Sequence, residues 1–321
     1  MIQLFKNNNP LALLILACIA AIPHFHAPSS QLVLNIPIEH EPLGDLFQKA
    51  TNHFFETKSI WNSILSIIII LTEALALNKI ITDIKLIDRP GFIPALCFVL
   101  FSSLIPAQYQ SYNLLTNGLI LIVLNNIAAF YKKDKPNSAI LLASFTAGII
   151  AGFSPGNLPL FLWLSGALFI MRPASLREWM LMITGFVLPY YFLIAGLYLA
   201  NSLDLGTIFH FQKADLKFPH LPTPFWIRSA FFFVLPLFGF IYYFNNLTKM
   251  LIQARRVHTI IFLLFLASSL MAFLRIEHAP FSFFIITIPA SILASPLFGS
   301  SKRAFLPNLL LLIVLFLCLI G

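Results

Sequence analysis

Apolar runs alternate with short polar connections along the whole chain. We predict membrane crossings at residues 10–27, 59–79, 91–106, 113–131, 139–153, 158–171, 179–201, 225–246, 259–275, 281–298 and 305–320. A bilayer is spanned by a helix of about 20 apolar residues, and a helix satisfies its own backbone hydrogen bonds in lipid. The pattern therefore predicts an all-α polytopic membrane protein with about 10–11 transmembrane helices, which form one integral membrane domain over residues 1–321.

Every second connection between these crossings is basic. The cations of these five connections are, in chain order, Lys79, Lys85 and Arg89; Lys132, Lys133 and Lys135; Arg172 and Arg177; Lys249, Arg255 and Arg256; and Lys302 and Arg303. Lys and Arg are retained on the cytoplasmic side during membrane insertion. The alternation predicts a cytoplasmic N-terminus and a multi-pass protein of the bacterial inner membrane. Most histidines fall in the other connections, and His258 is the one assigned to the cytoplasmic side.

The composition supports a membrane protein. Hydrophobic residues make up 59% of the chain and charged residues 10%, which is too apolar for a soluble fold. The net charge of +8 would suggest nucleic acid in a soluble protein. Here the cations lie at predicted cytoplasmic helix ends, so topology explains them. We expect membrane lipids as partners, and no nucleic acid.

The first apolar run has two interpretations. Residues 11–22, with the small residues Ala20 and Ala21 near their end, resemble the apolar part of a signal peptide. Alternatively, Asn9 and Pro10 start a retained helix as N-cap and first helical residue. We favour the retained helix, because the next crossing then returns to a basic connection.

Two connections on the predicted periplasmic side are long. Residues 28–58 contain Leu43, Leu46, Phe47, Ala50 and Phe54 on one helical face, which predicts an amphipathic helix on the outer leaflet. The same residues could instead form the leading turns of the second crossing. The second connection, 202–224, is rich in proline and is predicted to be irregular.

Some predicted crossings are shorter than a bilayer. The pair 139–153 and 158–171 is joined by Ser154-Pro155-Gly156-Asn157, where Pro155 and Gly156 suit the centre of a type II turn. Such pairs are either half-helices beside a cavity or tilted helices in a thin region. Gly148 and Gly152 form a G-x-x-x-G spacing that allows close helix packing.

A capping box is predicted at the start of the crossing 179–201. Ser175 and Glu178 have the spacing in which the serine accepts from an early helix amide. The glutamate then reaches back to the serine N–H.

Carboxylates are concentrated in the first long connection. Glu39 and Glu41 stand at i and i+2, with Asp45 close behind. On an extended segment, side chains at this spacing point the same way, so they could act as a catalytic base or hold a divalent cation. The alternative is a solvated loop with ordinary surface charges. We predict no resident cofactor or metal site, apart from a divalent cation if the protein is a glycosyltransferase.

Cations are unusual on the predicted outer side. Arg275 closes the ninth crossing with His278 nearby, and Arg228 begins the eighth. Together they could hold the phosphate of a lipid, including a polyprenyl phosphate. The same residues also suit the anionic headgroups of ordinary phospholipids.

Polar residues within the apolar runs mark a further candidate site. Glu73 is the acidic residue well inside such a run, and the other intramembrane polar residues singled out are Asn78, Asn117 and Asn125. An intramembrane carboxylate is costly unless it is protonated or paired. Glu73 therefore suggests proton coupling in a transporter or hydrogen bonding between helices. The alternative is that Glu73 extends toward Lys79 and the cytoplasmic surface.

Three stretches carry a family resemblance. They are Met1-Ile2-Gln3-Leu4-Phe5-Lys6 with Asn9-Pro10; Arg172-Pro173, Arg177-Glu178-Trp179, Gly185 and Pro189-Tyr190; and Glu277-His278-Ala279. Together they resemble a family of polytopic inner-membrane proteins from Bacteroidota. That resemblance implies a membrane fold and assigns no catalytic residue.

The chain also resembles GT-C-type glycosyltransferases more loosely. Those enzymes have an acidic motif in the first outer loop, here Glu39-His40-Glu41 or Asp45, followed by a membrane-surface helix. They often have a Gly-rich crossing like residues 147–152. This chain departs from them in its short first outer loop and in lacking the usual paired Asp.

Three functions follow as hypotheses. The first is a non-enzymatic subunit of an envelope or secretion assembly, which would have other envelope proteins as partners. The second is a GT-C-like glycosyltransferase or polyprenyl-phosphate-binding protein. The third is a small-molecule transporter that uses Glu73.

Overall fold

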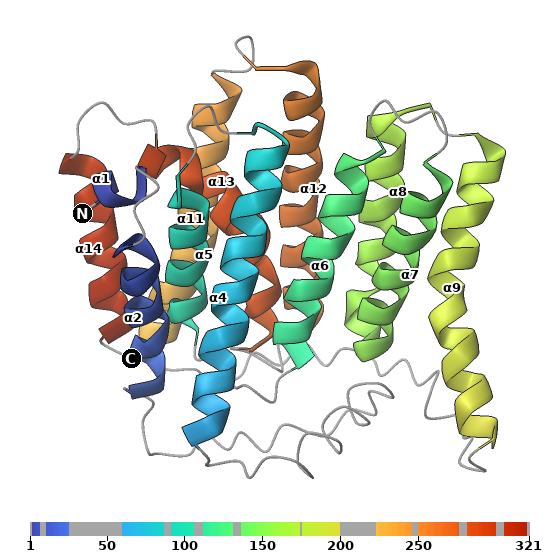
Figure 1. Cartoon of the computed structure of the whole chain (residues 1–321), viewed down its shortest axis with the longest axis horizontal. Helices are drawn as coiled ribbons and strands as arrows, with labels where there is room; N and C mark the ends of the chain where they lie inside the picture. The colour runs from blue at the N-terminus through green and yellow to red at the C-terminus, as the bar shows by residue number, and fades with distance from the viewer. Residues whose placement is uncertain are drawn as a thin grey trace.

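The structure is a computed structural model of the 321-residue chain (Figure 1). It describes residues 2–6, 11–25, 60–86, 91–105, 112–130, 136–173, 175–199, 223–245, 250–275, 281–299 and 305–319. Within these ranges the secondary structure is helical throughout. The α-helices are α1 (Ile2–Lys6), α2 (Leu11–Phe25), α4 (Ile60–Asp83), α5 (Ile93–Leu104), α6 (Tyr112–Ala128), α7 (Asn137–Phe153), α8 (Pro159–Met171), α9 (Leu176–Leu199), α11 (Thr223–Phe244), α12 (Ile252–Leu274), α13 (Thr287–Gly299) and α14 (Phe305–Leu319). The short 3₁₀ helices η1 (Pro155–Asn157) and η4 (Phe281–Ile286) precede α8 and α13.

The helices have the length and composition of membrane spans. Among the described residues, five segments are long and apolar enough to cross a bilayer, namely α4, α9, α11, α12 and the unit of η4 and α13. Six shorter apolar helices accompany them, which are α2, α5, α6, α7, η1 with α8, and α14. The protein is therefore a multi-pass integral membrane protein. The exact number of crossings stays a prediction from the sequence.

Successive helices run in alternating directions, as the colour gradient in Figure 1 shows. The helix ends that flank the basic connections therefore lie together, at the top of this view. We call this the basic side, and the other the opposite side. Among the described residues, Lys and Arg lie on the basic side apart from Arg228 and Arg275. This arrangement agrees with the alternation on which the predicted orientation rests.

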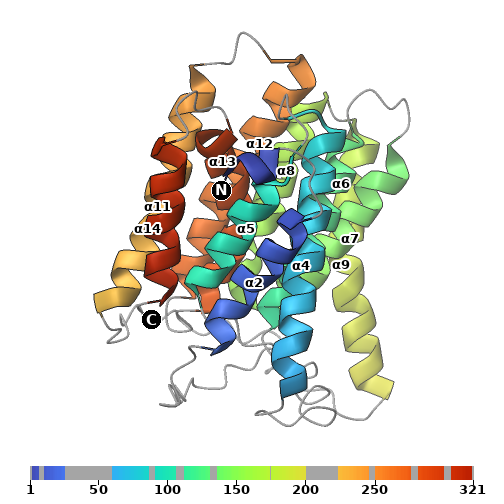
Figure 2. The same cartoon turned by 60° about the vertical axis from the view of Figure 1, so that its left-hand side comes forward.

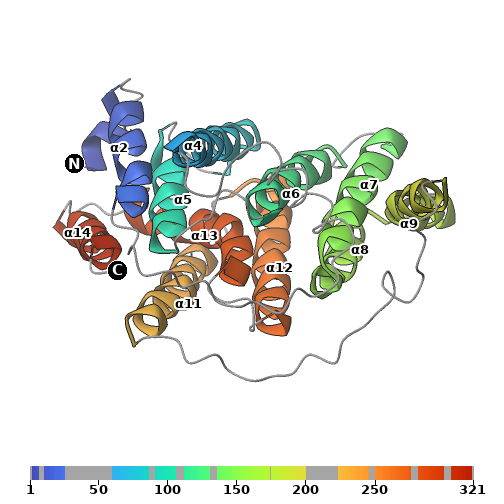
Figure 3. The same ribbon diagram turned by 90° about the horizontal axis from the view of Figure 1, so that it is seen from below.

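The core of the bundle is built around two short helices. α5 lies between α4 and α13, and α13 lies between α5 and α11, as the view along the helices shows (Figure 3). All residues of α5 are buried, and α13 is buried over most of its length. With 12 and 13 residues, α5 and α13 are only about 18 and 20 Å long. They are surrounded by longer helices that face lipid.

The outer helices complete the bundle around this core. α2 and α14 lie beside each other and both contact α5 (Figure 2). Residues Ala12, Leu16 and Ala20 of α2 are buried in this bundle. On the other flank, α6 packs on α7, and α8 packs on α12. α9 lies at the far end of the array and packs mainly on α7 (Figure 3).

Glycines allow the closest helix contact in that flank. A Cβ atom on Gly148 would overlap the Phe186 carbonyl and lie 3.0 Å from the Pro189 ring. A Cβ atom on Gly185 would overlap the Ser144 hydroxyl. The close packing predicted from the G-x-x-x-G spacing is confirmed at Gly148, and its partner is α9.

The predicted capping box is also confirmed. The Ser175 N–H donates to Glu178 Oε2 over 2.9 Å, and the Glu178 N–H donates to Ser175 Oγ over 3.4 Å. Glu178 is 5% exposed and also forms an ion pair with Arg172, with 3.3 Å between Oε1 and Nη2. α9 begins at Leu176, directly after this cap.

The predicted type II turn between α7 and α8 is wrong. A type II turn needs a positive φ at its third residue, and the structure has no glycine with positive φ among the described residues. Pro155–Asn157 form the 3₁₀ helix η1 instead, and the Asn157 N–H donates to the Ser154 carbonyl over 3.0 Å. Glycine is needed at position 156 for space, because a Cβ there would lie 2.5 Å from Cγ of Arg275.

Candidate functional site

A buried carboxyl group lies deep in the membrane part of α4. Glu73 is 6% exposed. Asp83, at the end of α4 on the basic side, is ten positions farther along the helix, which is about 15 Å along its axis. Ionised side chains at such depth are costly unless they find a proton or a partner. Glu73 is therefore the described side chain with the clearest capacity for chemistry.

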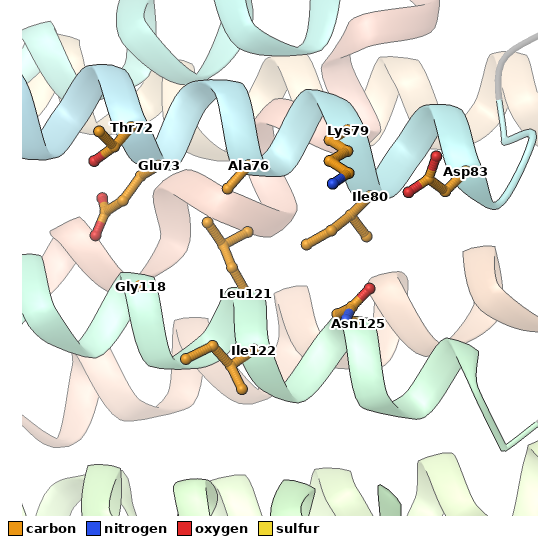
Figure 4. Close-up of a pocket in the computed structure, with 10 residues that line it drawn as sticks. All are labelled: Thr72, Glu73, Ala76, Lys79, Ile80, Asp83, Gly118, Leu121, Ile122 and Asn125. Atoms are coloured by element: carbon orange, nitrogen blue, oxygen red, sulfur yellow. The ribbon is translucent and has the colours of Figure 1, made fainter.

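The Glu73 carboxyl group is directed at the neighbouring helix α6. Figure 4 shows it pointing toward Gly118. A Cβ atom at Gly118 would lie 3.2 Å from Glu73 Oε1, so the glycine admits the carboxyl group. The other oxygen, Oε2, is buried and has no hydrogen-bond partner among the described residues.

The alternative in which Glu73 extends toward Lys79 is not adopted. The Lys79 side chain lies farther along α4, toward the basic side (Figure 4). The ion pair that the structure shows among its described residues joins Arg172 and Glu178 instead. Glu73 is thus held between helices and does not reach for the surface.

A pocket of about 390 Å³ runs from Glu73 between α4 and α6. Its lining residues are Thr72, Glu73, Ala76, Lys79, Ile80 and Asp83 of α4 and Gly118, Leu121, Ile122 and Asn125 of α6. The two helices run in the same direction, so the lining changes in step along both (Figure 4). We call the end with Glu73 and Gly118 the deep end, because it lies farther from the basic side, and the end with Lys79, Asp83 and Asn125 the mouth. The pocket is also open along its length, where Thr72, Ala76 and Ile122 are exposed.

The deep end of the pocket offers hydrogen-bond acceptors. The Thr72 hydroxyl donates to the Ile69 carbonyl over 2.8 Å, so its proton is engaged within α4. An ionised Glu73 has only acceptor oxygens. What this end can bind is therefore a proton or a group that donates hydrogen bonds, preferably one with positive charge.

The charges along the pocket leave a negative excess. Lys79 and Asp83 stand four residues apart on α4, where opposite charges lie next to each other on a helix, and both line the mouth. Their charges offset each other, which leaves the charge of an ionised Glu73 at the deep end. Among the described residues, no group of three or more His, Cys, Asp or Glu side chains could hold a metal ion.

The other predicted intramembrane polar residues divide into two sets. Asn125 joins Glu73 in the pocket, whereas Asn78 and Asn117 are outside its lining. Asn117 is fully buried and donates from Nδ2 to the Phe284 carbonyl over 3.1 Å and to Thr287 Oγ1 over 2.9 Å. This side chain ties α6 to η4 and α13, which fixes the wall of the pocket that carries Gly118.

The predicted phosphate-binding cations lie against different elements. Arg275 follows the end of α12, is 5% exposed and packs over Gly156 of η1. Arg228 is half-buried on α11. No described contact brings the two together, and Arg275 is buried where the sequence suggested an exposed patch. His278, the third residue predicted to hold the phosphate, lies outside the described residues.

The carboxylates of the first long connection cannot be placed. Glu39, Glu41 and Asp45, with the predicted amphipathic helix of residues 28–58, lie outside the described residues. The second connection, 202–224, is described only from residue 223. The catalytic roles suggested for these carboxylates remain predictions.

One buried titratable residue was missed by sequence reasoning. His258 was assigned to a connection, but α12 begins at Ile252 and contains it. The imidazole is 2% exposed and stacks on Tyr243 with 3.3 Å between ring centroids. Neither ring nitrogen has a hydrogen-bond partner among the described residues. The predicted crossing 259–275 begins one residue after His258, so the hydropathy pattern left this histidine in the basic connection.

Comparison with protein-family models, with curated protein sequences and with solved structures finds no match. The class of the protein therefore rests on its own fold and composition, which define a multi-pass membrane protein. The family resemblances suggested by the sequence stay predictions.

Proposed function

We propose that the protein is a membrane carrier for small molecules in which Glu73 exchanges a proton for its substrate in the α4–α6 pocket. The observation that carries this proposal is the buried Glu73 Oε2 without a described partner, at the deep end of a pocket that reaches the basic side. Neither the assembly subunit nor the glycosyltransferase has a comparable described site in its support.

The chemistry of an isolated carboxyl group supports coupling. Glu73 is stable in the membrane when it is protonated or when a cation neutralises it. A proton and a cationic substrate exclude each other at Glu73, because each neutralises the same carboxylate charge. Binding of substrate then releases a proton, and binding of a proton releases substrate. A carrier needs this exchange if it is to use a proton gradient.

The packing of the helices supports movement at the pocket. α4 packs chiefly on α5, and α6 packs chiefly on α7, while the contact between α4 and α6 is smaller. The pocket therefore lies between the group α4, α5, α13 and α11 and the group α6, α7 and α9, and the two groups are also joined through Asn117 of α6 and η4. Rocking of one helix group against another around a midplane site is the usual route of alternating access in carriers.

A cysteine placed in the pocket should be reachable from both sides of the membrane. We would replace Cys18, Cys97 and Cys318 by alanine, introduce Ala76→Cys, and label right-side-out and everted vesicles with an impermeant maleimide. Ala76 is exposed and lines the pocket, so the change leaves the core intact. We expect labelling in both vesicle types, and we expect its rate relative to that of Leu176→Cys at the same pH to change with pH. Adding Glu73→Gln should reduce labelling from one side at least tenfold.

Leu176→Cys is the matched control, because Leu176 is 77% exposed at the basic-side start of α9. It should be labelled from one side at every pH. Labelling of Ala76→Cys from one side only, with a rate relative to Leu176→Cys that changes neither with pH nor with Glu73→Gln, would contradict the carrier.

A further inference from the structure

We infer that the α4–α6 pocket binds a protonated primary or secondary amine with an apolar body, its ammonium group on Glu73 and its apolar part between Ala76 and Ile122. The inference rests on the proposed function, because it names the substrate class of the same site. The pocket has three zones along its length, which are the deep end, the middle and the mouth.

The deep end selects a cationic donor. Oε2 of Glu73 is buried and accepts no hydrogen bond from a described residue, and the nearby Thr72 hydroxyl donates within its own helix. A neutral alcohol would donate a hydrogen bond to Oε2 but would leave the negative charge of Glu73 without a partner. An ammonium group satisfies both, through a charge-assisted hydrogen bond. A quaternary ammonium has no N–H and would satisfy the charge alone.

The middle of the pocket selects an apolar body. Its lining residues here are Ala76 and Ile80 of α4 and Leu121 and Ile122 of α6. They carry no hydrogen-bonding side chain, so a polar ligand would lose its hydration without compensation. Ala76 and Ile122 are exposed on the surface of the bundle. A ligand that partitions into the bilayer can therefore reach this zone from the side.

The mouth excludes anions from the deep end. Lys79 is the cation that lines the pocket, and it is six positions beyond Glu73 on α4, which is about 9 Å along the axis. Asp83 lies one helical turn from Lys79 and also lines the mouth, so the two opposite charges leave the mouth with no net charge. An anion at the deep end would meet the carboxylate of Glu73 without a neighbouring cation. The pocket as a whole therefore favours a single positive charge.

The size of the pocket limits the ligand. A volume of about 390 Å³ lies near the lower end of small-molecule sites. Gly118 leaves little room next to the carboxyl group, because a single added carbon would lie 3.2 Å from Oε1. A small ammonium head with one aromatic ring or a short alkyl chain fits these limits.

Phenethylammonium is the probe that tests this inference. We would titrate it into the full-length protein in lipid nanodiscs and measure heat of binding, with Glu73→Gln and Ala76→Leu as variants. We expect saturable binding to the unmodified protein. Its affinity should rise up to tenfold for each unit by which the pH is raised, because the amine displaces a proton from Glu73. Both variants should weaken binding at least tenfold, the first by removing charge and the second by filling the middle of the pocket.

Two further ligands sharpen the test. Phenylacetate has the opposite charge and should not bind, and benzyltrimethylammonium lacks N–H donors and should bind at least tenfold more weakly. Equal heats for phenethylammonium with the unmodified protein and Glu73→Gln would show partition into lipid and overturn the inference. Binding of phenylacetate through the same pocket would overturn it as well.

The outcomes separate this inference from the proposed function. Labelling of Ala76→Cys from both sides, without binding of phenethylammonium, would leave the carrier standing and reject the amine. Specific amine binding with labelling from one side would confirm the ligand class and reject the carrier.

Discussion

Replacing Gly239 with alanine is expected to lower the free energy of unfolding by about 2 kcal/mol or more, which is a large overpacking penalty. Gly239 is buried on α11 where that helix meets α13. An added Cβ would overlap the Leu293 carbonyl and lie 3.2 Å from Cα of Ala294. These atoms are backbone, so no side chain can rotate away. α13 is also packed on α5, so it cannot move away from α11 without disrupting the buried core.

Gly196→Ala is the matched control for that substitution. Gly196 lies in α9, and a Cβ atom there would have no heavy atom within 4 Å. Alanine is the better helix former, so this variant should unfold no earlier than the unmodified protein. Thermal unfolding in detergent, followed by intrinsic fluorescence, compares the two. Equal midpoints for both variants would show that α11 and α13 do not pack as closely as the structure has them.

Replacing Glu178 with alanine is expected to cost about 2 kcal/mol, from loss of a helix cap and of a partner for a charge. Glu178 accepts from the Ser175 N–H and pairs with Arg172, whose side chain is 26% exposed. Because Arg172 reaches solvent, the ion pair contributes the smaller share. The cap matters more, since it sets where α9 begins and how α9 meets α7.

Glu178→Gln separates the two contributions. Glutamine keeps the acceptor that the capping box needs and loses the charge that attracts Arg172. In the same unfolding measurement, we expect Glu178→Gln to keep more than half of the stability that Glu178→Ala loses. If alanine and glutamine at this position were equally destabilising, the ion pair and not the cap would hold the α8–α9 corner.

The positions of the helices were largely predictable from the sequence. Lipid demands long apolar runs, and most predicted crossings match a helix to within a few residues, as 139–153 matches α7. α12 is the largest departure. Its first two turns contain Arg255 and Arg256, which the hydropathy pattern places in a connection. Arg255 is exposed, and Arg256 donates to the Met171 carbonyl, so a helix end can carry both cations at the surface.

The candidate site was predictable only in part. Glu73 could be singled out because an acidic residue in an apolar run is costly and rare. Its partner helix could not, since hydropathy carries no information on which crossings are neighbours. Gly118 has no side chain to attract notice, yet it admits the carboxyl group. Asn117 and Asn125 look alike in sequence, but one ties α6 to η4 while the other lines the pocket.

Tertiary contacts also decided the turn between α7 and α8. Pro155 and Gly156 suit a type II turn by local preference. In the structure, Arg275 packs over Gly156 and Asn157 donates from Nδ2 to the Ile150 carbonyl over 3.0 Å. These contacts come from α12 and from the preceding helix, and a local pattern cannot anticipate them.

The most direct test of the account is whether Glu73 takes up and releases a proton inside the membrane. Dicyclohexylcarbodiimide reacts with protonated carboxyl groups in apolar surroundings, and peptide mass mapping locates the modified residue. We predict modification of Glu73 that falls as the pH is raised and is slowed by phenethylammonium. The capped and ion-paired Glu178 should stay unmodified. Glu73 unmodified at every pH, or modified to the same extent at all of them, would contradict the account.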